Sequence, residues 1–236
     1  MGDSAAAGSG GDVTPGVAYD CLIRNCARIV VCGASGSGKT QCIKNLLLSG
    51  ERAFEVPPER IYVFHLHWQP AYEELRSGSR VPVEFAVGPP PADFRPVPRA
   101  CVVFDDLQSS DSGAIEDFYL RRAHHEKCSS VVYVLQNLLV QNKTNRNILL
   151  NSSYYVLFRP RRDVSQVERL NYALLGSGHK RFLLDVFKSL SKGSNFSPLL
   201  VDLDPATPDA FQFRSTVVPQ SGQTVAFVPV SGGKRS

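Results

Sequence analysis

The chain has 236 residues, of which 43% are hydrophobic, and its formal net charge is +4. This length gives room for one α/β domain with a substantial core or for two small ones, and the apolar content is that of an ordinary soluble protein. No run of about 18 apolar residues occurs, which excludes a membrane-spanning helix and predicts that a membrane is not a partner. The mild positive charge leaves an acidic partner open.

The two ends of the chain differ in composition from its middle. Residues 1–18 are rich in Gly, Ala and Ser and are predicted to be a disordered tail. Residues 218–236 are predicted to be a flexible C-terminal tail, which leaves residues 19–217 as the folded domain. The N-terminus lacks the apolar segment of a signal peptide, so we do not expect secretion. The six cysteines form no C-x-x-C pair, and we expect free thiols in a reducing compartment, with Cys32 and Cys101 buried.

Between the tails, apolar runs alternate with helical patterns. The predicted strands cover residues 27–32, 60–65, 100–104, 131–135, 154–158, 199–203 and 211–216. The predicted helices cover residues 39–48, 71–77, 112–127, 163–175 and 180–192. Several strands are continuous and β-branched, as strands covered on both faces are. The alternation predicts an α/β fold with a mostly parallel central sheet flanked by helices on both faces.

The first predicted strand leads into a loop dense with Gly and Ser, and a helical pattern follows. The loop matches G-x-x-x-x-G-K-[ST] at every fixed position, with Gly33, Ala34, Ser35, Gly36, Ser37, Gly38, Lys39 and Thr40. Phosphate oxygens need several backbone N–H groups that point inward, and this curvature needs Gly. The helix start adds the positive end of its dipole. The pattern predicts a P-loop that binds ATP, with Lys39 on the β- and γ-phosphates and the Thr40 hydroxyl on Mg²⁺.

Two acids, Asp105 and Asp106, follow the apolar strand 100–104. Ligands of open α/β sheets bind at the carboxyl ends of the strands, which is where the loop and these acids both lie. We predict that Asp105 holds the metal and that Asp106 orients and polarises the attacking water. Adjacent acids favour hydrolysis over phosphoryl transfer to a small substrate, because water needs a positioned acceptor.

The strand 131–135 ends in Gln136 and Asn137. A polar amide at this position can touch both the γ-phosphate and the attacking water. Gln136 is therefore predicted to be a sensor of hydrolysis. The alternative is an amide that only caps the end of the strand.

These motifs, the strand "VVFDDL" and the stretch "LRRAHHEKCSSVVYVLQNLLVQNKTNRNILLNSSYYVLFRPRRD" together resemble the viral genome-packaging ATPases of the FtsK–HerA superfamily. The likeness is to the poxvirus-type branch, which includes the Maverick/Polinton-like packaging ATPases, and it covers roughly residues 27–216. The resemblance implies a P-loop ATPase domain over residues 19–217, with Lys39, Thr40, Asp105, Asp106 and Gln136 in the roles given above. Many members carry Glu as the second acid, and Asp106 is shorter by one methylene.

The resemblance also implies partners and a location. Such proteins are ATP-driven motors that thread double-stranded DNA into a preformed capsid. They usually form homo-oligomeric rings and meet capsid or portal components, which places them in the nucleus or cytoplasm of a host cell. A motor of this class needs a cation at the γ-phosphate from a neighbouring subunit, and Arg121 and Arg146 are the candidates because they flank the sensor strand. A solvated surface role is the alternative for each.

Two further groups of residues leave their roles open. Arg159, Arg161 and Arg162 follow a strand end, where they either line a DNA channel through phosphate contacts or form an ordinary basic loop. His65 and His67 follow each other at a spacing of two, but no third metal ligand is evident, so we expect a packing role.

Rival functions follow from the same motifs. The P-loop alone would suit a small-molecule kinase, although no Arg-rich lid sequence is present. A DNA-binding or capsid-adaptor protein that uses nucleotide structurally is a second rival, which the intact Lys39, Asp105 and Asp106 disfavour. A helicase or conjugative DNA pump of the same superfamily fits the motifs equally well.

Overall fold

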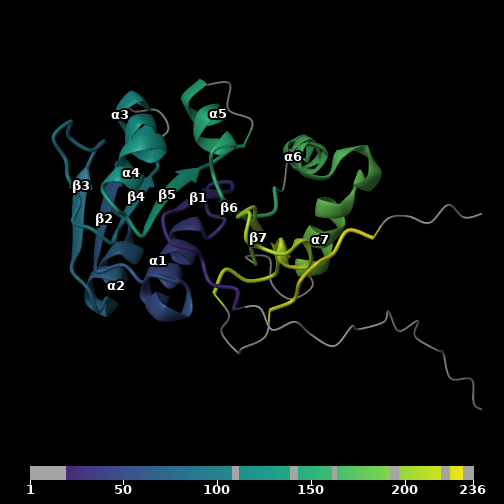
Figure 1. The fold of residues 1–236 in the computed structure, drawn as a ribbon, viewed down its shortest axis with the longest axis horizontal. Helices are drawn as coiled ribbons and strands as arrows, with labels where there is room; N and C mark the ends of the chain where they lie inside the picture. Colours follow the sequence, from purple (N-terminus) through teal and green to yellow (C-terminus); the bar gives the residue numbers. More distant parts are fainter. Residues whose placement is uncertain are drawn as a thin grey trace, which may run out of the picture.

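A single mixed sheet forms the centre of the protein. The computed structural model describes residues 20–107, 112–138, 143–160, 164–191, 197–218 and 224–230, so the predicted tail at residues 1–18 lies outside them. The described strands are β1 (Ala27–Cys32), β2 (Arg60–His65), β3 (Val83–Val87), β4 (Ala100–Asp105), β5 (Ser130–Leu135), β6 (Tyr154–Leu157), β7 (Leu199–Asp202) and β8 (Phe213–Arg214). They lie in the order β3-β2-β4-β5-β1-β6-β7-β8, as Figure 1 shows in part.

The helices connect these strands and cover both faces of the sheet. They are α1 (Lys39–Ser49), α2 (Pro70–Gly78), α3 (Ser112–Asp117), α4 (Ala123–His125), α5 (Lys143–Leu150), α6 (Ser165–Leu175) and α7 (Phe182–Leu190). Short 3₁₀ turns lie at Gly50–Arg52, Gly176–His179 and Asp209–Phe211, and a π-helical turn, Phe118–Arg122, joins α3 to α4. Strands β3, β2, β4, β5, β1 and β6 pair in parallel, whereas β7 and β8 pair antiparallel. The predicted fold class is confirmed.

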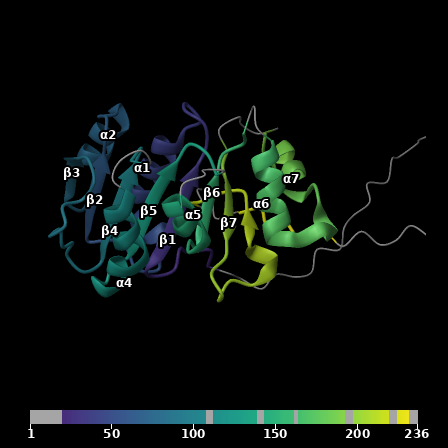
Figure 2. The same ribbon diagram turned by 90° about the horizontal axis from the view of Figure 1, so that it is seen from above.

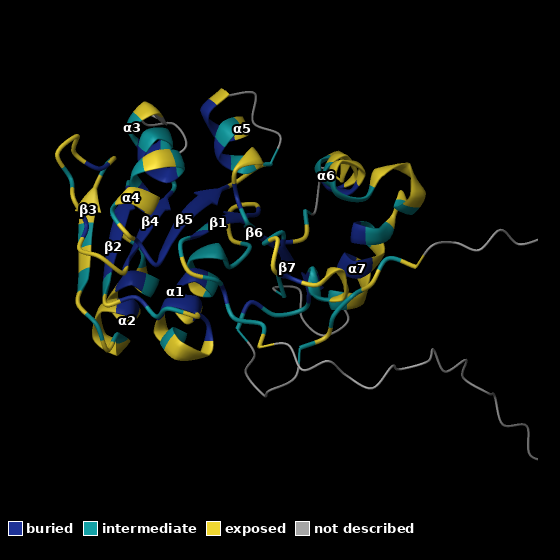
Figure 3. Cartoon of the chain, viewed as in Figure 1, coloured by how far each residue is buried: buried dark blue, intermediate teal, exposed yellow. Residues whose placement is uncertain are grey.

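Alternate residues of each strand enter separate cores on the two faces. In β1, Ile29 and Val31 pack with α1 and α2 on one face, while Val30 and Cys32 pack with the remaining helices on the other. Figure 2 shows α1 and α2 apart from α4 and α5, and Figure 3 shows buried strands between helices with exposed outer sides. Because both faces are covered, every residue of β4 and β5 is buried, which explains their unbroken apolar sequences.

Three elements differ from the prediction. The strand β3 was not predicted, because it is a short, partly exposed edge strand beside a Pro-rich connection. The helix α5 was not predicted either, since its first half, Lys-Thr-Asn-Arg, is polar and only Ile148 provides a fully buried apolar anchor. The predicted continuous helix over residues 112–127 is broken by the π-helical turn, in which the consecutive residues Phe118 and Tyr119 are both fully buried.

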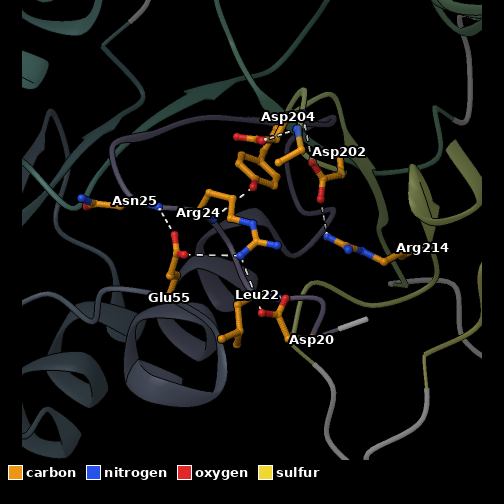
Figure 4. A network of polar contacts seen from close by, with 10 residues as sticks. Asp20, Leu22, Arg24, Asn25, Glu55, Asp202, Asp204 and Arg214 are labelled. Atoms are coloured by element: carbon orange, nitrogen blue, oxygen red, sulfur yellow. Dashed lines mark hydrogen bonds and ion pairs between the residues drawn. The ribbon is translucent and has the colours of Figure 1, made fainter. Parts of the chain in front are cut away.

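A buried ion pair joins the two antiparallel strands. Arg214 of β8 and Asp202 of β7 approach to 2.8 Å, and neither side chain is exposed (Figure 4). The same view shows Arg24, whose side chain pairs with Glu55 at 3.3 Å and whose backbone N–H donates to the Tyr154 hydroxyl at 3.0 Å. Removing one partner of a buried pair costs about 3–5 kcal/mol, so Arg214 fixes β8 against β7.

Part of the segment predicted to be a flexible C-terminal tail lies along β8. Ala226 forms an antiparallel bridge with Arg214, and the Phe227 N–H donates to the Phe213 carbonyl at 2.8 Å. Residues 219–223 and 231–236 of that segment lie outside the described residues.

Candidate nucleotide-binding site

The glycine-rich loop joins the carboxyl end of β1 to the start of α1. Gly38 precedes α1 with a φ of 96°, a left-handed value that favours glycine. Gly33 is required for a different reason, because a Cβ there would lie 2.6 Å from the Cβ of Phe158 and 2.7 Å from the Ser37 hydroxyl. The strand residue Phe158 therefore packs directly against the loop, and its N–H donates to the Cys32 carbonyl at 2.8 Å.

The Lys39 side chain folds back over this loop. Its ammonium donates to the carbonyl oxygens of Gly33, at 2.7 Å, and Ala34, at 3.0 Å. Burial lowers the pKa of Lys39 below its usual value, and the nearby Asp105 carboxylate opposes that shift. A partly desolvated ammonium is attracted more strongly to an anion than one in water, so Lys39 is well suited to bind a phosphate group.

The Asp105 carboxylate, at the end of β4, is almost fully buried, with 2% of the residue exposed. Its Oδ2 accepts a hydrogen bond from the Tyr72 hydroxyl at 2.6 Å and a longer one from the Thr40 hydroxyl at 3.4 Å. Burial raises the pKa of Asp105, whereas the hydrogen bond from Tyr72 lowers it. The predicted metal-binding pair, Thr40 and Asp105, therefore lies together.

Asp106 turns the chain out of the strand. Its φ of 60° is in the left-handed region, which Asp tolerates better than most residues. Consecutive residues of a strand point to opposite faces, but this turn allows both Asp105 and Asp106 to line one cavity. The Asp106 Oδ1 accepts a hydrogen bond from the Gln136 amide at 2.9 Å.

The order of the strands explains how Gln136 reaches Asp106. Strand β5 lies between β1, which leads into the loop, and β4, which carries the acids. Parallel strands end at the same edge of a sheet, so the amide after β5 lies between the loop and the acids. The loop, the two acids and the predicted sensor meet at one edge.

A cavity of about 340 Å³ collects these groups. It is lined by Ser35, Gly36, Gly38, Lys39, Thr40, Gln41, Gln69, Pro70, Ala71, Asp105, Asp106 and Gln136. Gly33 and Ala34 line an adjoining cavity of about 490 Å³, together with Ser35 and Gln136. Among the described residues, the two cavities therefore include every loop residue predicted to bind nucleotide except Ser37.

The two candidate arginines do not line either cavity. The Arg121 side chain is 79% exposed and pairs with Asp117 at 3.3 Å. The preceding residue, Leu120, accepts a hydrogen bond from Arg28 near the start of β1, so Arg121 lies toward the sheet edge opposite the loop. Arg146 is exposed on α5. A role for either one in a neighbouring subunit's site stays a prediction.

The sequence analysis missed the contribution of α2 and the segment before it. Gln69, Pro70 and Ala71 line the cavity, and Tyr72 holds Asp105 from a position 33 residues away in the sequence. No local pattern reports this contact, because it depends on the pairing of β2 with β4. His65, the partner of Asp105 in that pairing, is buried, and its ring lies 5.1 Å from the Tyr72 ring, which agrees with the predicted packing role.

The side chains present fit a magnesium–nucleotide complex. Mg²⁺ prefers oxygen ligands, and the Thr40 hydroxyl and Asp105 carboxylate converge to 3.4 Å. Lys39 supplies a cation and the start of α1 supplies backbone N–H groups, both of which suit phosphate oxygens. No helix in the described part of the chain is long and apolar enough to cross a membrane.

The sheet order and the loop together define the class of the fold as that of a P-loop NTPase. No family model matches the chain, and no curated protein matches it either. Solved structures with a related arrangement include the genome-packaging NTPase B204 of Sulfolobus turreted icosahedral virus 2. Its complex with sulfate has 11% identity and a TM-score of 0.45 over 87% of this chain and 97% of that one.

The complex of B204 with AMPPCP has 12% identity and a TM-score of 0.46 over 87% of this chain and 98% of that one. The Legionella pneumophila ATPase DotB has 12% identity and a TM-score of 0.35 over 58% of this chain and 41% of that one.

Proposed function

We propose that this protein is an ATPase that translocates double-stranded DNA and packages a viral genome into a preformed capsid. The observation that carries the hydrolytic part is the hydrogen bond of 2.9 Å between Gln136 and Asp106, beside the P-loop. It links an acid able to polarise water to an amide that borders both cavities. The viral packaging part is supported by the sequence resemblance to the FtsK–HerA packaging ATPases.

The residues divide the work in the following way. Lys39 and the loop N–H groups bind the β- and γ-phosphates of ATP. Thr40 and Asp105 hold Mg²⁺, which neutralises charge on the phosphate oxygens when bound. Asp106 orients the attacking water and accepts its proton, and Gln136 holds the Asp106 carboxylate in position. When the γ-phosphate leaves, Gln136 changes its partner and passes the change to the segment after β5.

The same site requires a partner subunit for full activity. In the described part of the chain, neither cavity contains an arginine, so the γ-phosphate has Lys39 as its only cation from this chain's cavity lining. A head-to-tail ring places one subunit's arginine in the next subunit's site, and an arginine supplied in this way is worth roughly 10³ to 10⁵ in rate. Arg121 and Arg146 are the proposed residues.

ATP turnover with and without duplex DNA tests the function. We expect turnover that duplex DNA stimulates and that Lys39→Ala abolishes, because the main cation on the β- and γ-phosphates is lost. Turnover that responds to a small phosphate acceptor instead of DNA would identify a kinase. Nucleotide binding without turnover, with or without DNA, would identify an adaptor and refute the proposal.

A further inference from the structure

A second, basic cavity lies next to the nucleotide loop, between the segment after β6 and α7. It has a volume of about 420 Å³ and is lined by Arg159, Pro160, Val164, Arg181, Leu184, Phe187 and Lys188. Three of these side chains are cationic and none is acidic. All three cations are exposed, while Phe187 is buried beneath them.

The charges of this cavity are only partly balanced. Lys188 pairs with Asp185 at 3.1 Å, and the Arg159 guanidinium donates to the neutral Ser191 hydroxyl at 2.8 Å. No ion pair is recorded for Arg181 among the described residues. The cavity therefore combines a net positive rim with an apolar floor formed by Leu184 and Phe187.

One short segment connects this cavity to the nucleotide loop. Phe158 packs against Gly33 of the loop, Arg159 lines the basic cavity, and Pro160 lines both the basic cavity and the adjoining 490 Å³ cavity. Phe187 of α7 also lines both. A displacement of the loop on binding or release of phosphate would therefore reach the basic cavity within two residues.

We propose that this cavity, defined by Arg159, Arg181 and Lys188, binds the sugar–phosphate backbone of a nucleic acid. Cations on flexible side chains fit phosphates spaced along a strand, and the apolar floor fits the sugars between them. A single small anion would be held by buried, fixed donors, whereas these three are exposed. The inference rests on the proposed function, since it names the contact through which a DNA-moving ATPase grips its substrate.

The test measures binding of a fluorescent DNA duplex to the full chain at 50 and 200 mM salt. The variant Arg181→Ala/Lys188→Ala removes two cavity cations, and Arg169→Ala/Lys180→Ala removes the same charge from the neighbouring helices without touching the cavity lining. Each lost phosphate contact lowers the salt exponent by about 0.9, so a fourfold salt change should alter Kd about tenfold less in the cavity variant than in the wild type. The control variant should keep the wild-type salt dependence.

Further measurements separate the possible outcomes. ATP turnover without DNA should be equal in the wild type and both variants, and Arg181→Lys/Lys188→Arg should keep the wild-type salt dependence. Equal losses in the cavity and control variants, or no loss in either, would overturn the cavity assignment while DNA-stimulated turnover keeps the proposed function intact. A wild-type protein that neither binds DNA nor is stimulated by it would refute both. Competition by inorganic phosphate or polyglutamate, but not by unlabelled DNA, would assign the cavity to another ligand.

Discussion

The hydrogen bond from Tyr72 to Asp105 offers a direct test of how the site is built. Tyr72→Phe removes only the hydroxyl and keeps the ring, which packs against His65 and Phe85. The lost bond, 2.6 Å long, goes to a carboxylate in a residue that is 2% exposed. Hydrogen bonds to charged groups contribute about 1.5–3 kcal/mol, so we expect the free energy of unfolding to fall by that amount.

The effect should appear as a lower melting temperature. In a domain of this size each kcal/mol shifts Tm by about 2–4 °C, which gives a decrease of roughly 3–12 °C at pH 7. Saturating Mg²⁺ and nucleotide should reduce the difference, because Asp105 then has another positive partner. A difference that magnesium–nucleotide leaves unchanged would refute the placement of Asp105 at the metal.

The pH dependence has a definite sign. Burial raises the pKa of folded Asp105, so the folded state binds more protons than the unfolded state between the two pKa values, and this group's contribution to stability falls as pH rises through that interval. The Tyr72 bond lowers the folded pKa, and its removal widens the interval. The stability difference between wild type and Tyr72→Phe should therefore be largest at neutral pH and shrink as Asp105 becomes protonated.

A matched control is available in Tyr133→Phe. The Tyr133 hydroxyl donates to the neutral amide oxygen of Asn145 at 2.7 Å, and both residues are buried. This change should also destabilise the protein, by about 0.5–1.5 kcal/mol plus the cost of the unpaired amide oxygen. Its effect should depend neither on magnesium–nucleotide nor on pH between about 4 and 8, because no carboxylate is involved. Identical behaviour of the two variants would contradict the account of Asp105.

Three other predictions address the loop, the acids and the assembly. Gly33→Ala should lower the free energy of unfolding by about 1–3 kcal/mol in chemical denaturation, because the new Cβ meets Phe158 at 2.6 Å; unchanged stability would show that Phe158 can move away. Asp106→Asn should retain magnesium-dependent ATP binding and hydrolyse ATP slowly, whereas Asp105→Asn should lose the magnesium dependence itself; nucleotide titrations with and without Mg²⁺ decide, and reversed phenotypes would exchange the two roles. Arg121→Ala or Arg146→Ala should keep ATP affinity and lose turnover, and mixing either variant with Lys39→Ala should restore some activity; mixtures that co-assemble without recovery would exclude that arginine as the residue supplied in trans.

The sequence alone determined the local parts of this protein. The loop could be read because phosphate binding needs glycines, a lysine and a hydroxyl at fixed spacing in one continuous stretch. The central strands could be read because strands covered on both faces are apolar throughout, as in β4 and β5. Asp105, Asp106 and Gln136 could be placed near the loop because they follow such strands, and all parallel strands end at the same edge.

Only the tertiary structure decided which side chains touch. The order β4-β5-β1 places Gln136 between the loop and Asp106, and the pairing of β2 with β4 brings Tyr72 to Asp105. The basic cavity joins Arg159 to Arg181 and Lys188 of a helical segment more than twenty residues further along the chain. Such contacts leave no periodic trace in the sequence, because hydrophobic patterns report which face of an element is buried and not which element buries it.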